Sequence, residues 1–529
     1  TGIWTMPTLG GTSILLKTLE GTDQNLLKWS KDGATIYFGH RKNLFAFDLT
    51  SKQITKLTDL DSWQSTQITF NVSPDEEKIA FIANENKQSD IWVISKNGGQ
   101  PIRITNDKFE EGYLVWHPDG QRIIYDSVHN DISQIFAGRL DGSPPMQLIF
   151  SDNSNYVSDV SPNGNKILYY SQRDDADLWK VNLNDSKETR LTENIGLEFW
   201  SDAAPDGKTF VFQATNTTDT TKRVFNASII SQSTSEDSQP LQLNENGYLP
   251  LWSPDGKQVA FLRFENGLDN LLTIPSIGGE AKPLTTNGVS FGGRSLLPFN
   301  RVQTQDYQWS PDGRSLIYCA RRGNISNVWQ AMADGSGEKQ LTNNTEKQIW
   351  FNNPVFSPDG QRIAFLGLVL PTAEQKDRKW TIWIYEAGKT KILFQSESML
   401  GIIGWSAIGK DIIIKSSTDK RASPFPADIE LLQISADNST THKLPQLNAA
   451  YLKNISLSPD KQIIAFVARK DEMDSIHLVT VKDGTERIIL TSNDSRVFFG
   501  SLAWSPDSKA IYFGKQSNWQ IISTIENYK

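Results

Sequence analysis

The residues that could support acid–base or metal chemistry are few and far apart in the sequence. The five histidines, His40, His117, His129, His442 and His477, stand singly, with no pair at the i, i+4 spacing that places two ligands on one helix face. The acidic run DDAD at 174–177 lacks the alternating pattern of a calcium loop, and we expect it to lie on a solvated loop. We therefore predict no metal site and no cofactor.

Two residues have the chemistry of nucleophiles, but neither stands in a catalytic context. The segment GVSFG at 288–292 matches the G-x-S-x-G elbow, which requires a strand before the serine and a helix after it. The residues after Ser290, GRSLLPFN, carry no helix signal. The single cysteine, Cys319, lies in the apolar run LIYCA, which is typical of a buried, unreactive thiol. We predict no catalytic residue.

A ten-residue motif recurs throughout the chain and defines the elements. WSPDGKQVAF at 252–261 has relatives from Trp116, Trp309, Phe356 and Trp504. Serine, proline, aspartate and glycine in this order favour a tight turn, and the apolar run that follows is typical of a strand. A second hairpin signal follows each turn, as in DIWVISKNGGQPIRIT at 90–105. Each unit is therefore predicted to hold four strands, named A to D in chain order.

The period of the motif predicts a radial array of four-stranded blades. The turn serine or its equivalent stands at 30, 73, 117, 161, 204, 253, 310, 357, 406, 458 and 505, with gaps of 43 to 57 residues. Four strands in about 40 to 45 residues is the period of a propeller blade. We therefore predict an all-β fold of about eleven blades, which is too many for one ordinary ring and favours two rings.

These repeats resemble the TolB-type, WD40-like β-propeller. The resemblance rests on the apolar-SPDG-strand motif and on a Leu-Thr pair later in the unit, and it covers nearly the whole chain; the pair stands at Leu57-Thr58, Leu191-Thr192, Leu284-Thr285, Leu341-Thr342 and Leu490-Thr491. The unit with WSAIGKDIII, from Trp405, departs from the motif because it lacks the proline and aspartate. The arrays are also similar to the sensor regions of CadC-like winged-helix transmembrane regulators.

The longest interval between turns suggests a domain boundary. It contains the Gly-rich, aperiodic segment 288–306. We expect a first propeller at 1–288, with a half-blade at 1–18 and about six blades, and a second at 306–529 with about five. A seven-plus-four division is the alternative. We also expect residues 12–18, TSILLKT, to supply the missing outer strand of the last blade, built from Ser501 to Ile525.

Aromatic residues cluster just before the turns, where strand D connects to the next strand A. Such rings either line a binding mouth at the central funnel or wedge between neighbouring blades. The candidates for the binding role are Tyr113, Tyr156, Trp200, Tyr248, Tyr307, Trp350, Tyr451 and Phe499.

The resemblance implies a non-enzymatic sensing or protein-interaction domain in the periplasm or another extracytoplasmic compartment of a bacterium. The expected partner is a protein, a peptide or a small molecule. The net charge of −8 argues against nucleic acid, and membrane attachment would have to come from an upstream segment. The alternative is a propeller enzyme, a polysaccharide lyase or a hydrolase-associated domain, with its site in the funnel.

Overall fold

The computed structural model describes residues 2–526 and 528 except for 9, 20–25, 64–67, 86–87, 130–131, 152, 194–195, 216–226, 235–238, 290–306, 372–376, 418–428 and 445–451. All regular elements in these residues are strands, and the pairings between them are almost entirely antiparallel. With no helix among them, the described residues contain none that is long and apolar enough to cross a membrane. The all-β prediction is confirmed.

The repeated turn forms because its serine and aspartate replace the missing backbone partners. In the turn at 253–258, the Ser253 hydroxyl donates to Asp255 Oδ1 over 2.7 Å and accepts from the Gln258 amide over 3.0 Å. Gly256 adopts a left-handed φ of 70°, which glycine reaches at little cost. The same serine–aspartate bond recurs at Ser310 and Ser357. The turn therefore connects strands A and B in each blade.

The Leu-Thr pair also has a defined role in the blade. The Thr192 hydroxyl accepts a hydrogen bond of 2.9 Å from the backbone amide of Leu178. Thr285 and Thr342 accept equivalent bonds from strand C of their own blades. Because the threonine lies just beyond strand D, this bond holds the outer edge of these blades to strand C.

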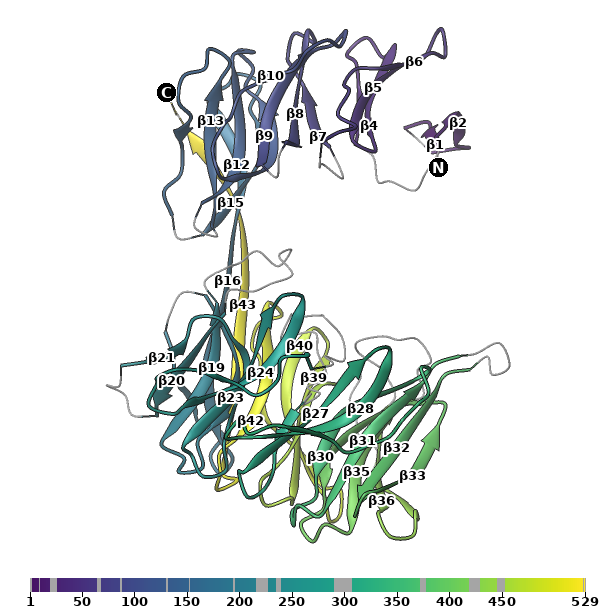
Figure 1. Ribbon diagram of the computed structural model, residues 1–529. Coiled ribbons are helices and arrows are strands. Elements are labelled where there is room, and N and C mark those ends of the chain that lie inside the picture. Colours follow the sequence, from purple (N-terminus) through teal and green to yellow (C-terminus); the bar gives the residue numbers. More distant parts are fainter. Residues whose placement is uncertain are drawn as a thin grey trace. The chain divides into compact units, whose positions relative to one another are not determined.

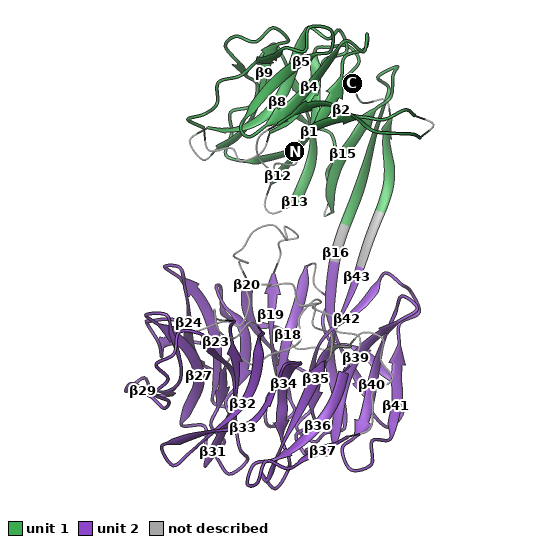
Figure 2. Ribbon diagram, turned by 90° about the vertical axis from the view of Figure 1, so that its right-hand side faces the viewer, with its two compact units in different colours: residues 1–173, 519–529 green, residues 174–518 purple. Residues whose placement is uncertain are grey.

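The chain divides into two compact units, which are coloured separately in Figure 2. Unit 1 comprises Thr1–Arg173 and Trp519–Lys529. It contains a hairpin, three four-stranded blades and a three-stranded blade. The hairpin is formed by β1 (Gly2–Thr5) and β2 (Ile14–Thr18). The four-stranded blades are, first, β3 (Leu27–Trp29), β4 (Thr35–His40), β5 (Asn43–Asp48) and β6 (Ile54–Lys56); second, β7 (Thr69–Val72), β8 (Lys78–Glu85), β9 (Gln88–Ser95) and β10 (Ile102–Arg103); and third, β11 (Glu110–Trp116), β12 (Arg122–His129), β13 (Ile132–Arg139) and β14 (Met146–Gln147). The three-stranded blade combines β15 (Ser154–Val160) with parts of β16 (Lys166–Asn182) and β43 (Ala510–Glu526).

Unit 2 comprises Asp174–Asn518 and contains seven blades. Six of them are continuous in sequence: β18 (Leu197–Ala203), β19 (Thr209–Thr215), β20 (Ala227–Ser233) and β21 (Leu241–Asn244); β22 (Tyr248–Trp252), β23 (Gln258–Glu265), β24 (Leu268–Pro275) and β25 (Lys282–Pro283); β26 (Tyr307–Trp309), β27 (Ser315–Arg322), β28 (Ile325–Met332) and β29 (Glu338–Gln340); β30 (Ile349–Phe356), β31 (Arg362–Val369), β32 (Lys379–Glu386) and β33 (Lys389–Ser396); β34 (Met399–Trp405), β35 (Asp411–Ser417), β36 (Ile429–Ser435) and β37 (Thr441–Lys443); and β38 (Leu452–Leu457), β39 (Ile463–Lys470), β40 (Met473–Thr480) and β41 (Glu486–Thr491).

The seventh blade of unit 2 is built from both ends of that unit. Its strands are β42 (Val497–Trp504), the first half of β43, the second half of β16, and β17 (Glu188–Arg190). Lys515 on β43 forms an ion pair of 2.8 Å with Glu188 on β17. The ring closes because β42 packs on the blade of β38–β41 and, on its other side, Ser501 accepts a hydrogen bond from the Trp200 amide.

The closing strand predicted from residues 12–18 is therefore wrong. These residues lie largely in β2, which pairs with β1, whereas β16 lies beside β43. The expected loop at DDAD is also wrong, because β16 continues through 174–177 as one strand of 17 residues. Both β16 and β43 are shared by the two units, and Figure 1 shows them running side by side.

The predicted boundary at 288–306 does not coincide with the division that the structure shows. Leu262 and Leu271 before this segment and Tyr307 and Leu316 after it lie in one buried cluster, so the segment connects two neighbouring blades of unit 2. The eleven blades are divided into four and seven. The expected second ring is not confirmed, because Figure 1 shows the first hairpin and the last blade of unit 1 at opposite ends of a row.

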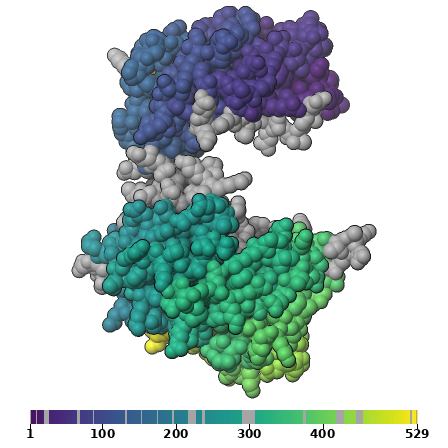
Figure 3. All heavy atoms as spheres, in the orientation of Figure 1, coloured from purple at the N-terminus to yellow at the C-terminus, as the bar shows by residue number. Residues whose placement is uncertain are grey.

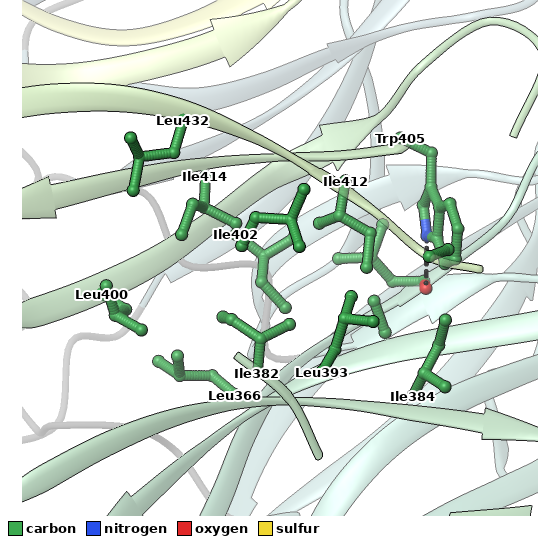
Figure 4. Close-up of a cluster of buried hydrophobic side chains, with 14 residues drawn as sticks. Leu366, Ile382, Ile384, Leu393, Leu400, Ile402, Trp405, Ile412, Ile414 and Leu432 are labelled. Carbon is green, nitrogen blue, oxygen red and sulfur yellow. Dashed lines mark hydrogen bonds between the residues drawn. The ribbon is translucent and has the colours of Figure 1, made fainter. Parts of the chain in front are cut away.

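The core lies between the blades, since each sheet buries both faces against its neighbours. Figure 4 shows the cluster between β30–β33 and β34–β37, in which Ile382, Ile412 and Ile414 are fully buried. Trp405 closes its edge and donates its indole N–H to the Val355 carbonyl over 3.1 Å. Apolar side chains therefore alternate between two blade interfaces along each strand.

Candidate functional sites

Four of the eight predicted aromatic residues pack inside unit 2, three of them buried and Tyr248 partly buried. Phe499, Tyr307 and Trp200 have exposed fractions of 0, 1 and 8 percent. The Tyr307 hydroxyl donates to the carbonyls of Leu249 and Ala260 in the preceding blade, and the Tyr248 hydroxyl donates to Asp269. These rings connect strands and blades, as the wedge alternative describes.

The other predicted residues differ in their environment. Tyr113 is partly buried against the interface between the third and fourth blades of unit 1. Tyr156 stacks on Tyr170 at 4.9 Å between centroids, and Tyr170 is exposed. Trp350 is exposed, with the Arg321 guanidinium 4.5 Å from its ring centroid. Tyr451 lies outside the described residues. The eight residues therefore do not converge on one site.

A β-bulge recurs in the inner strands and connects neighbouring blades. The register shifts within eight strands A, for example between Phe199 and Asp202 in β18. Backbone amides near the bulges donate to side chains of an adjacent blade. These bonds run from Trp252 N to Asp202, from Phe356 N to Gln308, from Ile402 N to Asn353 and from Phe499 N to Asp474, over 2.7 to 3.1 Å. The inner wall is thus held by polar bonds as well as apolar packing.

Three ionisable side chains are buried beside these inner strands. Burial raises the pKa of Glu111 to about 8 and that of Asp126 to about 7. Asp126 still accepts hydrogen bonds from the amides of Tyr113 and Val157. Burial lowers the pKa of Lys415 to about 7, and its ammonium nitrogen has no hydrogen-bond partner in the described part of the chain.

A pocket of about 330 Å³ opens where the turns of four unit 2 blades meet. Its lining comes from the ends of strands A and the following turns, and Lys461 is the one ionisable residue in it; the lining residues are Gln308, Trp309, Pro311, Asn353, Val355, Phe356, Ser357, Pro358, Ile402, Ile403, Gly404, Trp405, Ile455, Ser456, Leu457 and Lys461. None of the predicted aromatic residues is among them. The SPDG motif predicted these turns, but nothing in it indicated that they meet around a pocket.

A chain of polar side chains at His477 was not predicted from the sequence. The Ser475 hydroxyl is 2.7 Å from His477 Nε2, and His477 Nδ1 is 2.6 Å from Glu486 Oε1. This order matches the connectivity of a hydrolase triad. Ser475 and His477 are both buried, and the His477 ring stacks on Phe466. Ser475 and His477 both lie on β40, and only the pairing of β40 with β41 brings Glu486 to His477, so sequence spacing did not reveal the complete chain.

Other reactive residues take structural positions where they are described. Cys319 is buried in β27 between two blades, as its apolar context predicted. Ser290 lies outside the described residues. Within the described residues, no group of three histidine, cysteine, aspartate or glutamate side chains comes together in a way that could hold a metal ion.

One face of unit 1 exposes a tryptophan at a repeat position where the tryptophans of other blades are buried. Trp29, directly before the turn serine, is 55 percent exposed. The tryptophans at the equivalent position are 2 to 8 percent exposed, namely Trp116, Trp252, Trp309, Trp405 and Trp504. Four of them donate the indole N–H to a carbonyl of strand A in the preceding blade, as Trp309 does to Leu251.

Among the described residues, the neighbour of the Trp29 blade on this side is the two-stranded β1–β2 hairpin, whereas the other tryptophans face a four-stranded blade. The β1–β2 hairpin packs on the outer part of the next blade, against Phe38 and Phe47. No strand of the described residues covers the inner part, so Leu27 and Trp29 on β3 are exposed, as are Trp4 and Leu15 on the hairpin. The blade that carries this face is drawn in purple at one end of unit 1 in Figure 3.

The fold and these sites define a protein of the β-propeller class, built from SPDG-turn blades and without a helix among the described residues. Residues 26–239 match the family model described as TolB beta propeller domain. This part of the chain is therefore TolB-like.

The relatives in sequence are distant. An uncharacterized protein of Agrobacterium fabrum is 22 percent identical over 254 residues, which are 45 percent of this chain and 83 percent of the relative. A Tol-Pal system protein TolB of Anaeromyxobacter dehalogenans is 27 percent identical over 116 residues. That match spans 22 percent of this chain and about a quarter, 24 percent, of the TolB protein.

Among solved structures, the chain is similar to the β-propeller domain of the Trilobed protease from Pyrococcus furiosus. The identity is 12 percent and the TM-score is 0.45, over 64 percent of this chain and 99 percent of that domain.

Proposed function

We propose that this chain is a non-enzymatic interaction and sensing module, located in the periplasm or another extracytoplasmic compartment of a bacterium, and part of a signalling or transcription-regulatory protein. The TolB-like match over residues 26–239 supports an interaction module. The resemblance of the repeats to CadC-like sensor regions supports the regulatory role. The expected ligand is a protein that supplies an extended segment.

The observation that carries this proposal is the exposure of Trp29. In four other blades the equivalent indole N–H bonds to a backbone carbonyl of the adjacent strand A. Trp29 has no such bond in the described part of the chain. A partner strand beside β3 would supply the carbonyl and cover the rings of Trp29 and Leu27. Burial of a tryptophan of this kind is a common source of binding energy at interfaces.

Photo-crosslinking in the native host tests the proposal. A photoreactive phenylalanine analogue is placed at Trp29 and, as the control, at Ile408, an exposed apolar residue of a turn in unit 2. We expect a discrete protein adduct at position 29 that position 408 does not give, and mass spectrometry then identifies the crosslinked peptide. Equal labelling at both positions, or no adduct at position 29, would overturn the proposal.

The Ser475–His477–Glu486 chain favours hydrolysis as a second candidate function. The order of the bonds fits a serine nucleophile activated by a histidine base. Burial of Ser475 opposes this role, because the hydroxyl has little access to a substrate. A fluorophosphonate probe decides whether Ser475 is a nucleophile or a buried structural residue. Labelling at Ser475 that is lost in Ser475→Ala would establish the enzyme, and we expect no labelling.

A further inference from the structure

Two adjacent turns of unit 2 depart from the repeat, and the residue that departs in the second turn, Lys461, lines the pocket described above. Six of the seven A–B turns of this unit have proline after the first position, whereas the turn between β34 and β35 has Ala407. The next turn, between β38 and β39, has Lys461 where five of the others have glycine. Lys461 keeps the left-handed conformation of that glycine, with φ of 63°.

The repeat explains why these two departures belong together. A Cβ placed on the turn glycine would point at the proline of the preceding turn, at 3.3 Å from Pro358 for Gly409 and at 3.5 Å from Pro311 for Gly360. A long side chain at this position would meet that proline ring. The turn before Lys461 has Ala407 in place of the proline, and this smaller residue leaves room for the lysine side chain.

The lysine side chain lines the pocket, and the adjacent Asp460 is the acidic residue whose charge acts on it. Among the described residues no hydrogen bond or ion pair is formed by its ammonium group, and the adjacent Asp460 is instead bonded by the Ser458 hydroxyl and the Gln462 amide. Burial lowers the pKa of Lys461. The lining contains no acidic residue, and its walls include Phe356, Ile403 and Leu457.

We propose that this pocket binds an organic anion with an apolar body, a carboxylate attached to an aromatic or aliphatic group, through the ammonium group of Lys461. The volume of about 330 Å³ is at the lower end of the range for small-molecule sites. The ammonium group favours an anion. Phe356, Ile403 and Leu457 offer apolar contacts to the body of the ligand, beside polar lining residues such as Gln308 and Asn353. This site is separate from the Trp29 face, so the two proposals stand or fall independently.

Binding of phenylacetate to the full chain tests the proposal, with phenylacetamide as the uncharged match. We expect saturable binding of phenylacetate by isothermal titration or ligand-observed NMR, and at least tenfold weaker binding of the amide. N-acetylphenylalanine distinguishes the source of the carboxylate: tighter binding than phenylacetate indicates the C-terminus of a peptide, and weaker binding indicates a small acid.

Three variants locate the site. Lys461→Gly restores the residue that the turn ordinarily has, so it is expected to melt no lower than the wild type while losing at least tenfold in affinity. Ala407→Pro restores the proline and should also weaken binding. Lys410→Ala removes an exposed charge next to the Ala407 turn, outside the lining, and should bind as the wild type does. The proposal is wrong if phenylacetate does not bind, if the amide binds equally well, or if Lys461→Gly retains full affinity.

Discussion

Lys415 and Glu111 are each buried without an opposite charge to compensate, and they give the two units opposite responses to pH. Lys415 lies in β35 of unit 2 and Glu111 in β11 of unit 1. The pKa of the lysine falls to about 7 and that of the glutamate rises to about 8, in both cases mainly through burial. Each group favours its neutral form in the folded state.

The substitution Lys415→Met should stabilise unit 2, and more so at low pH. Below pH 7 the lysine is protonated in both states and the folded state bears the full cost of the buried charge. Between pH 7 and about 10.5 only the unfolded state remains protonated, so the cost declines as pH rises. We expect a gain of roughly 3 kcal/mol at pH 6 that is mostly lost by pH 10, measured by thermal unfolding. The control Lys410→Met, at an exposed lysine, should change nothing; an equal gain at both pH values would contradict the assignment.

The substitution Glu111→Gln should stabilise unit 1 with the opposite dependence. Well below its ordinary pKa of 4.5 the carboxyl is protonated in both states, and at pH 4.5 the unfolded state is only half ionised, so the amide offers little advantage there. As pH rises toward 8 the unfolded state ionises first, and the wild type loses stability until the folded pKa is passed. We expect a gain of about 2 to 4 kcal/mol at pH 8.5 and almost none at pH 4.5. Calorimetry at the two pH values checks this, and a gain that is already present at pH 4.5 would refute it.

Individual site residues were only partly predictable. Tyr307 and Phe499 stand at the spacing of a funnel lining, but packing against adjacent blades buries both, and a bulge follows Phe499 in its strand A. A burial of this kind depends on neighbouring blades that sequence spacing alone does not place. Ala407 and Lys461 were visible as departures from SPDG, yet only the ring brings them together.

At the scale of the blade, the tryptophan before the turn serine allows the effect of interblade packing to be measured at one repeat position. Trp405 and Trp29 both precede a turn serine, but among the described residues only Trp405 packs against a four-stranded blade on its preceding side. We expect Trp405→Ala to destabilise unit 2 by about 3 to 5 kcal/mol, because it leaves a cavity and removes an interblade hydrogen bond. The matched Trp29→Ala should cost less than about 1 kcal/mol, as is usual for an exposed residue. Similar losses for the two variants, measured by chemical denaturation, would show that the Trp29 face is covered.

The blade was the part of the fold that sequence predicted best. The turn, the A–B hairpin and the Leu-Thr pair are local signals, and each corresponds to bonds within one blade, such as those of Ser253 and Thr192. The length of strands β16 and β43 was not predicted from the sequence. Whether DDAD at 174–177 forms a loop or continues a strand depends on the strand that pairs with it, and that partner is far away in the sequence. The absence of glycine and proline from that segment was the available signal.

At the scale of the molecule, the shared strands make unit 1 depend on the last residues of the chain. Ile525 and Tyr528 pack on the interface between its third and fourth blades, and Lys166 forms an ion pair of 2.7 Å with Glu526. Removing residues 519–529 should lower the melting temperature of unit 1 by several degrees and leave the transition of unit 2 unchanged. Glu526→Gln should have little effect, because exposed ion pairs contribute little.

Calorimetry of the truncated chain measures both transitions. A shift confined to unit 2, or none at all, would show that β43 contributes nothing to unit 1.

The predicted pairing between residues 12–18 and the last blade was wrong because the strands that close a ring pair across the whole sequence, and the repeat makes several possible partner strands look alike. The interval around 288–306 misled in the same way, since a long connection between blades looks like a boundary.

The nesting of unit 2 within unit 1 has a consequence for biosynthesis. The ribosome makes the first blades of unit 1, then all of Asp174–Asn518, and only afterwards the strand that completes the last unit 1 blade. At bacterial elongation rates of about 5 to 20 residues per second, the nascent unit 1 waits roughly 20 to 70 seconds for that strand. During this interval the side chains of Val157 and Ile167 lack the cover of Ile525. The half-made unit is therefore the stage at which we expect chaperones to engage the chain.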